Sequence, residues 1–299
     1  MEALADFRPL EVVVETCPFW PWIHDRLQGT DIGFHLAHAS RLEAIARSKK
    51  KTDKVDAELM ARMLLAGLIP EVYPKPADQR EKCYLIRHRA SLVRDRTRCC
   101  NRIHNHLMHR GLQLPREQLL RKAARQWLED TAWPELSEEQ RRSVECHLEF
   151  IELLSVQIQE FDERIEERAG QCPAAALLQS IPGIGPYRSL LLVGEISPIQ
   201  RFPTAKHLVS FAGLAPTVRQ SGPKDPYHGR IPKGANRWVR GALVSAIPSH
   251  MNATPDSSLG QYYQKQKERV GWRTARVAAA RKLCRAIRAM LRSGELWRG

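Results

Sequence analysis

Two long segments that lack helix breakers constrain the fold of this chain more than any other feature of its sequence. Residues 78–112 contain no proline, and their first glycine is Gly111. Residues 137–169 contain neither proline nor glycine, and their apolar side chains recur mostly at steps of three or four residues. The recurring side chains are Leu148, Ile151, Ile158, Phe161 and Ile165. Each segment is therefore predicted to form one long helix.

The two predicted long helices carry opposite charge. Between residues 80 and 110 there are nine basic and two acidic side chains, whereas residues 117–170 contain fourteen acidic and seven basic ones. The sequence between the helices contains Pro115 and Pro134, which interrupt helical structure. This arrangement predicts an antiparallel helical hairpin or coiled coil as a middle domain, residues 76–170.

The first part of the chain alternates β-branched runs with helical patterns. The predicted elements are, in order, a buried strand at residues 10–15, a short helix at 18–29, a strand at 31–39 and a helix at 52–68. Thr52 can cap the last helix and Gly67 can end it. This order is typical of a parallel or mixed sheet, so we expect residues 1–75 to form an α/β domain.

The last part of the chain, residues 171–299, is predicted to be mainly helical. Its predicted elements are a helix, a tight glycine turn and a helix over residues 177–196, loop-like sequence at 213–234, a helix at 235–250 and a basic helix at 261–292. The cysteines of the whole chain are seven in number and include no C-x-x-C pair, which favours a reducing cytosol over a disulfide framework.

The positive charge of the chain is concentrated near its C-terminus. The whole chain has a formal net charge of +14, and residues 171–299 contain 20 basic but only 5 acidic side chains. Such an excess favours a polyanionic partner, and nucleic acid is the first candidate. A membrane surface is the weaker alternative, and the sequence contains neither a long apolar run nor a secretory signal pattern.

The sequence IPGIGP at residues 181–186 resembles the turn of a helix–hairpin–helix motif. Gly183 and Gly185 would allow the backbone to approach a phosphate, and the N–H groups that begin the next helix would point at that anion. Such a contact positions DNA without reading its bases. The alternative is an ordinary helix end followed by a new helix.

Three carboxylates are candidate ligands for Mg²⁺. Glu15 lies where the first predicted strand ends, and Asp53 and Asp56 lie three residues apart on one face of a predicted helix. Hard oxygen ligands of this kind suit Mg²⁺. The two aspartates also have a simpler explanation, because acidic residues at a helix start oppose the helix macrodipole.

A third candidate site is a serine surrounded by basic side chains. Ser221 precedes a glycine in a segment that contains many cationic residues, which would bring a hydroxyl nucleophile to a phosphodiester and stabilise the developing charge. The cationic residues of this segment are Arg219, Lys224, Arg230, Lys233, Arg237 and Arg240. No neighbouring residue stands out as the general base. The alternative is a solvated basic turn in which the serine has no role.

Taken together and in this order, several motifs resemble the DEDD-type insertion-sequence transposases, also called bridge-RNA-guided recombinases. The motifs are VVVET (12–16), KKTDKVDAELMARML (50–64), RTRCCNRIHNHLMHRGL (96–112), SIPGIGPYRSLLLVGEI (180–196), the segment from Arg201 to Val244, and RTARVAAARKLCRAI (273–287). The resemblance covers essentially the whole chain.

The resemblance implies a RuvC/RNase-H-like N-terminal domain, a coiled-coil hairpin and a C-terminal transposase domain with a catalytic serine. Ser221 matches the serine that attacks DNA and becomes covalently joined to it. Glu15, Asp53 and Asp56 match the second, third and fourth of four acidic residues that bind Mg²⁺ in that family. The family also implies a homo-oligomer, dimer or tetramer, in the bacterial cytoplasm at the nucleoid. A structured non-coding RNA would then pair with the DNA and choose its sequence.

The sequence departs from the family pattern at its start. In the family the first acidic residue is an aspartate on an opening strand, whereas fourteen residues precede Glu15 here and Asp6 does not match that context. We therefore expect the opening strands of the sheet to be missing from this chain. The main interpretation is a recombinase that uses Ser221 and Mg²⁺. The alternatives are an inactive derivative that still binds DNA or RNA, and a metal-dependent nuclease that does not use the serine.

Overall fold

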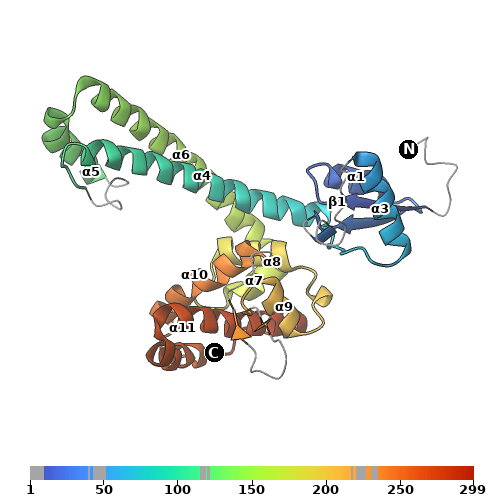
Figure 1. The fold of residues 1–299 in the computed structure, drawn as a ribbon. Coiled ribbons are helices and arrows are strands. Elements are labelled where there is room, and N and C mark those ends of the chain that lie inside the picture. The colour runs from blue at the N-terminus through green and yellow to red at the C-terminus, as the bar shows by residue number, and fades with distance from the viewer. Residues whose placement is uncertain are drawn as a thin grey trace. The chain divides into compact units, whose positions relative to one another are not determined.

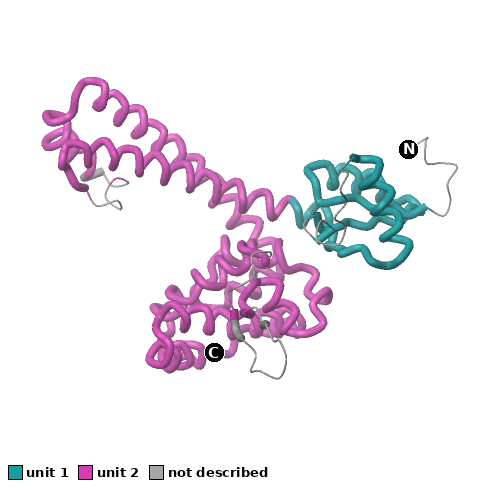
Figure 2. Tube along the Cα trace, viewed as in Figure 1, with its two compact units in different colours: residues 1–80 teal, residues 81–299 magenta. Residues whose placement is uncertain are grey.

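The computed structural model describes the chain in several stretches, and these divide into two compact units. The described residues are 10–39, 41–42, 52–114, 119, 122–216, 218–219, 227–229 and 235–299. The first unit comprises residues 1–80 and the second residues 81–299, drawn in different colours in Figure 2. None of the described helices is both long enough and apolar enough to cross a membrane.

The first unit contains a small parallel sheet with helices. Strands β1 (Glu11–Glu15) and β2 (Gly33–Ala37) are parallel, and helix α1 (Trp20–Leu27) lies between them in sequence. Helix α3 (Asp53–Leu65) contributes the buried Met63 to an apolar cluster that also includes Ala37 of β2 and Val13 of β1. Both strands and both helices confirm the elements predicted from the sequence.

The burial of the first strand differs from the prediction. The three valines of β1 are half-buried and its two terminal glutamates are exposed. Among the described residues, β2 is the one strand that pairs with β1. A β-branched run indicates a strand, but the degree of burial depends on what covers its faces and edges, which the run itself does not encode.

The second unit begins within helix α4 (Ala77–Met108), which forms a hairpin with the long antiparallel helix α6 (Glu138–Gly170), as Figure 1 shows. Ser137 and Gln140 form a capping box that begins α6. Arg89 of α4 forms two hydrogen bonds with Asp162 of α6, with N–O distances of 2.9 and 2.8 Å. Near the other end of the pair, Nε2 of His106 lies 3.1 Å from Oγ of Ser143. The antiparallel hairpin is thus present, while coiled-coil packing stays a prediction.

The far end of the hairpin is closed by short helical pieces. These are α5 (Lys122–Trp127), a π-helix at Leu128–Ala132 and a 3₁₀ helix at Trp133–Glu135. Apolar side chains from these pieces join those of α4 and α6 in one cluster, in which Ile103, Leu128, Ala132 and Val144 are almost fully buried. The hairpin therefore has an apolar core of its own in addition to its ion pairs.

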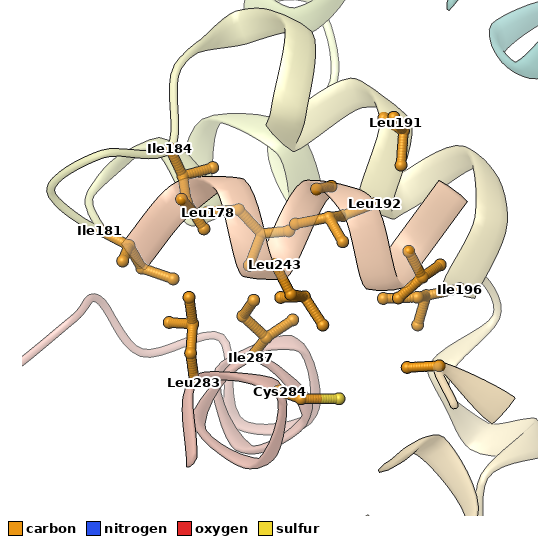
Figure 3. Packing of buried hydrophobic residues seen from close by; sticks show 14 of the residues in the cluster. Leu178, Ile181, Ile184, Leu191, Leu192, Ile196, Leu243, Leu283, Cys284 and Ile287 are labelled. Carbon is orange, nitrogen blue, oxygen red and sulfur yellow. The ribbon is translucent and has the colours of Figure 1, made fainter. Parts of the chain in front are cut away.

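In the described remainder of the second unit, five helices pack around an apolar core that is larger than the other described clusters. They are α7 (Pro173–Gln179), α8 (Pro186–Ile196), α9 (Ala205–Phe211), α10 (Arg237–Ala253) and α11 (Ser258–Ser293). Figure 3 shows Leu192 and Ile196 of α8, Leu243 of α10, and Leu283 and Ile287 of α11 converging in this core. A 3₁₀ turn (Ile199–Arg201) follows α8, and two short antiparallel strands, β3 (Val218–Arg219) and β4 (Tyr227–His228), precede α10.

Candidate functional site

The three predicted metal ligands lie at element ends in the first unit. Glu15 is the last residue of β1, and Asp53 and Asp56 lie in the first turn of α3. Oγ1 of Thr52 caps this helix by accepting a hydrogen bond from the N–H of Val55, with an N–O distance of 3.4 Å. Glu15 and Asp53 are exposed and Asp56 is half-buried.

These carboxylates are not gathered into one site by the described structure. Nowhere in the described stretches do three or more His, Cys, Asp or Glu side chains form a group that could hold a metal ion. The three residues therefore do not form a complete metal site by themselves. Their role as Mg²⁺ ligands stays a prediction from the family resemblance.

The glycine turn between α7 and α8 is held against α10. Gly183 has a φ of +89°, and a Cβ atom placed there would lie 2.6 Å from the backbone nitrogen of His250. Nδ1 of His250 lies 2.8 Å from the carbonyl oxygen of Pro182. Arg188 donates a hydrogen bond of 2.7 Å to the carbonyl oxygen of Gly183. Gly183 is thus needed for packing within the protein.

Gly185, the second glycine of the turn, faces open space. It is exposed, it precedes the first residue of α8, and a Cβ atom placed on it would meet no heavy atom within 4 Å. Of the two predicted DNA-contacting glycines, Gly185 is exposed and Gly183 is half-buried against α10. The geometry is that of a helix, a tight turn and a helix, and the helix–hairpin–helix assignment stays a prediction.

We expect Gly183→Ala to destabilise the protein by about 2–4 kcal/mol, because the new Cβ atom would be strained at positive φ and would collide with α10. The matched control is Gly185→Ala, which should change the free energy of unfolding by less than about 0.5 kcal/mol. Urea denaturation of both variants measures the difference. Equal stabilities for the two variants would contradict the assigned packing role of Gly183.

Most residues of the predicted serine site lie outside the described residues. These are Ser221, Lys224, Arg230 and Lys233. Arg219 is described only as a backbone position of β3, where it pairs with Tyr227 of β4. Ser221 belongs to the sequence that joins these two strands. The described surroundings of the site are therefore the strand pair before and after Ser221 and the start of α10, which includes Arg237.

The start of α10 is fixed by an asparagine that the sequence analysis did not single out. Oδ1 of Asn236 accepts hydrogen bonds from the N–H groups of Trp238 and Val239, at 3.0 and 3.1 Å, and so caps the helix. Its own N–H donates to the carbonyl oxygen of Phe211, at 2.8 Å. Its Nδ2 group donates to Oε2 of Glu195, also at 2.8 Å.

Glu195 is a buried carboxylate that connects three helices. It lies on α8 and is only 3% exposed. Oε1 of Glu195 accepts a hydrogen bond of 2.6 Å from Arg87 of α4, while Oε2 accepts the bond from Asn236 at the start of α10. The signal available in the sequence was an acidic residue inside the apolar run LLLVGEI, because a charge in a buried helix requires partners.

We expect Glu195→Ala to lower the free energy of unfolding by about 2–3 kcal/mol, since Arg87 and Asn236 both lose their acceptor. The loss should not be larger, because the Arg87 side chain is 47% exposed and can be solvated. Glu268→Ala, at an exposed position of α11, makes the same charge change and should have little effect. Thermal or urea unfolding checks both, and a neutral Glu195→Ala would contradict the proposed linkage.

Two predicted nucleic-acid contacts are brought together by the fold. Gly185 and Arg237 line the same pocket of the second unit, although they are about fifty residues apart in sequence. Arg237 is exposed. The structure thus combines part of the predicted DNA-binding set, whereas the carboxylates lie in the other unit.

Two family models match separate segments of the chain. A model described as Transposase IS116/IS110/IS902 family matches residues 175–264. A model of the DEDD transposases of IS110, described as Transposase, matches residues 32–109. The chain belongs to the IS110/IS116 family of transposases. The family match over residues 175–264 contains Gly183, Glu195 and Ser221, and the match over 32–109 contains Asp53 and Asp56.

Curated relatives have names that agree with this family. The chain is 28% identical over 270 residues to "Putative transposase y4rJ" of Sinorhizobium fredii, and the aligned region covers 82% of this chain and 66% of the relative. It is 37% identical over 127 residues to an uncharacterized 43.6 kDa protein of insertion element IS110 from Streptomyces coelicolor, covering 42% and 30%. It is 27% identical over 299 residues to the transposase for insertion sequence element IS1111A of Coxiella burnetii, covering 96% and 79%. The chain thus spans at most about two thirds of the first two relatives.

Proposed function

We propose that this chain cleaves and rejoins DNA as a transposase of the IS110/IS116 family, with Ser221 as the nucleophile. The observation that carries the proposal is the family match over residues 175–264, which includes Ser221 and the structural elements on both sides of it. The charge of the same part of the chain supports DNA as the substrate, because residues 171–299 contain 20 basic and 5 acidic side chains.

In this proposal the Ser221 hydroxyl attacks the phosphorus of the scissile phosphodiester. A bond forms between the serine oxygen and phosphorus, the bridging P–O bond to the leaving strand breaks, and the serine proton is transferred to the solvent or a base while the leaving oxygen takes up a proton. The hydroxyl of the new strand end then attacks the serine–phosphate bond and restores Ser221. Cationic side chains would stabilise the charge at phosphorus. They are Arg219, Lys224, Arg230, Lys233 and Arg237.

The proposal includes Glu15, Asp53 and Asp56 as the acidic residues of a RuvC/RNase-H-like domain that uses Mg²⁺. The family match over residues 32–109 contains Asp53 and Asp56 and supports this role for them, while Glu15 lies before the match. The side chains of Glu15 and Asp53 are exposed and therefore accessible. The described residues do not form a cluster of three metal ligands. The cleavage and rejoining steps are therefore assigned to Ser221 and the basic residues alone.

The proposed partners are DNA, a structured non-coding RNA and further copies of the chain. Base pairing by an RNA would supply the choice of sequence, and the protein would then need to hold only backbone and shape. A surface rich in basic side chains and poor in acidic ones, as in residues 171–299, suits such binding. In an oligomer, the carboxylates of one subunit would act together with the serine of another.

The dispersed carboxylates favour one alternative, which is a derivative that binds DNA or RNA without cutting it. The deciding experiment incubates the protein with DNA containing the ends of its element, with divalent metal and the RNA transcribed from the element, and separates the products under denaturing conditions. Adducts that link the protein to DNA support the recombinase. Binding without adducts supports the inactive derivative, and cut DNA without adducts supports a metal-dependent nuclease.

A further inference from the structure

A pocket of about 470 Å³ lies on the second unit where α4, α8 and α10 meet. Its lining includes three arginines, one from each of these helices, and two aromatic side chains. The residues that matter here are Arg89, Tyr187, Arg188, Arg237 and Trp238, with Gly185 at the start of α8. None of the described residues that line the pocket is acidic. Its chemistry is therefore cationic and aromatic.

The three arginines differ in how their charge is compensated. Arg89 is paired with Asp162 through two hydrogen bonds, so its charge is largely neutralised. Arg188 donates to the carbonyl oxygens of Gly183 and Ser245, at 2.7 and 3.1 Å, which fixes its guanidinium group but leaves its positive charge. Arg237 is exposed. Among the described residues, neither Arg188 nor Arg237 has an acidic partner, so the pocket has two positive charges besides Arg89, and that of Arg188 is held in a fixed position.

The pocket also contains two aromatic rings, each of which has an arginine over one of its faces. The guanidinium group of Arg89 lies over the Tyr187 ring, 5.2 Å from its centroid, and that of Arg87 lies 5.7 Å from the centroid of Trp238. Burial raises the pKa of Tyr187, so its hydroxyl stays neutral at physiological pH. Both rings are half-buried, which keeps their orientation fixed while leaving part of each surface accessible.

Fixed cations beside partly exposed aromatic rings are what proteins use to hold single-stranded nucleic acid. The cations bind phosphate, and an unpaired base stacks on an aromatic ring whatever its identity. A base pair in a duplex cannot present its face in this way, so such a site prefers an unpaired strand. Asn236 caps α10, and Arg237, the first residue of this helix, lines the pocket. In sequence, both residues follow the segment that contains Ser221.

We propose that this pocket binds one phosphate and the adjoining unpaired base of a nucleic-acid strand, and that the strand is DNA. This inference rests on the proposed function for its choice of DNA. Arg188 and Arg237 bind the phosphate, and Trp238 and Tyr187 receive the base. Single-stranded RNA offers the same phosphate and base chemistry, so the experiment below separates the two sources.

The test measures binding of the full chain to short fluorescent oligonucleotides by anisotropy, with no cleavage step. The probes are a thymidine DNA strand, a uridine RNA strand of equal length and a DNA duplex of equal length. Trp238→Leu keeps an apolar, though smaller, side chain but removes the stacking face, and should weaken binding of the DNA strand by about five- to a hundred-fold. Binding of the duplex should change by less than about twofold.

Arg237→Gln provides a second variant, because this exposed side chain can be changed with little risk to the fold. It should weaken binding of the DNA strand and reduce the magnitude of the salt slope by about one. The matched control is Arg292→Gln, an exposed arginine of α11 outside the pocket, which should leave strand binding near the wild-type value. Urea unfolding midpoints confirm that each variant is folded.

The outcomes separate this inference from the proposed function. The inference is supported if the variants lose affinity for the DNA strand selectively. If they lose affinity for the RNA strand selectively, the pocket is still a nucleic-acid site but DNA is overturned as its occupant. Equal losses for strand and duplex, or no loss with a folded Trp238→Leu, overturn the pocket as a site for an unpaired base. Because no adduct is measured, these results do not depend on whether Ser221 proves to be the nucleophile.

Discussion

Ser221→Ala is expected to abolish covalent protein–DNA adducts while leaving DNA affinity within about twofold of the wild type. The hydroxyl is the proposed attacking group, and removing a catalytic nucleophile lowers turnover by at least about 10³-fold, which is below detection in an adduct assay. Affinity should persist because it comes from many phosphate contacts and not from the serine. Denaturing gel electrophoresis of labelled DNA measures the adduct, and filter binding measures affinity.

The control for this prediction is a serine of the same unit that has no proposed role. Ser210 is exposed on α9, so Ser210→Ala removes a hydroxyl without touching the candidate site. It should form adducts at the wild-type rate. If adducts persist in Ser221→Ala, the nucleophile is another residue. The family match would then still hold, but the assignment of Ser221 as the nucleophile would be wrong.

A second large effect is expected from salt. If the basic surface neutralises six to ten phosphates, affinity for a DNA duplex should fall by about 10³- to 10⁵-fold between about 50 and 200 mM salt. The physical reason is that each phosphate contact releases a condensed counterion, which costs more free energy as salt rises. The 20 basic and 5 acidic side chains of residues 171–299 are sufficient in number for such contacts.

Fluorescence anisotropy at several salt concentrations gives the slope of log affinity against log salt. A duplex with an uncharged peptide backbone and the same bases is the control, because it keeps the base edges but carries no phosphate. It should bind at least about 100-fold more weakly than DNA at low salt, with little salt dependence. A flat response with DNA would contradict nucleic-acid binding through this surface and with it all three functional interpretations.

Local signals in the sequence predicted the elements well. Thr52 caps α3 as expected, and Gly67, two residues after that helix ends, has a φ of +67°. The two breaker-free segments became α4 and α6, whose opposite charges meet in pairs such as Arg89 with Asp162. These features depend on residues that are close in sequence or on a long uniform pattern. A single sequence is therefore sufficient to predict them.

Features that depend on tertiary contacts could not be predicted. The role of Glu195 requires α4, α8 and α10 to meet, and its partners Arg87 and Asn236 lie 108 and 41 residues away in sequence. The pocket combines Arg89 with Arg237 for the same reason. Asp53 and Asp56 lie at a helix start as predicted. Their convergence with Glu15 depends on tertiary structure, which the sequence pattern does not encode, and the described residues do not form such a three-ligand group.

The two oxygens of Glu195 give the second unit a mechanical property. One oxygen is bonded to the hairpin through Arg87, and the other is bonded to Asn236, directly after the segment that contains Ser221. If α4 slides along α8, either the hydrogen bond between Arg87 and Glu195 breaks, or the Glu195 carboxylate moves with α4 and displaces Asn236. The carboxylate of Glu195 thus couples helix α4 of the hairpin to the start of α10.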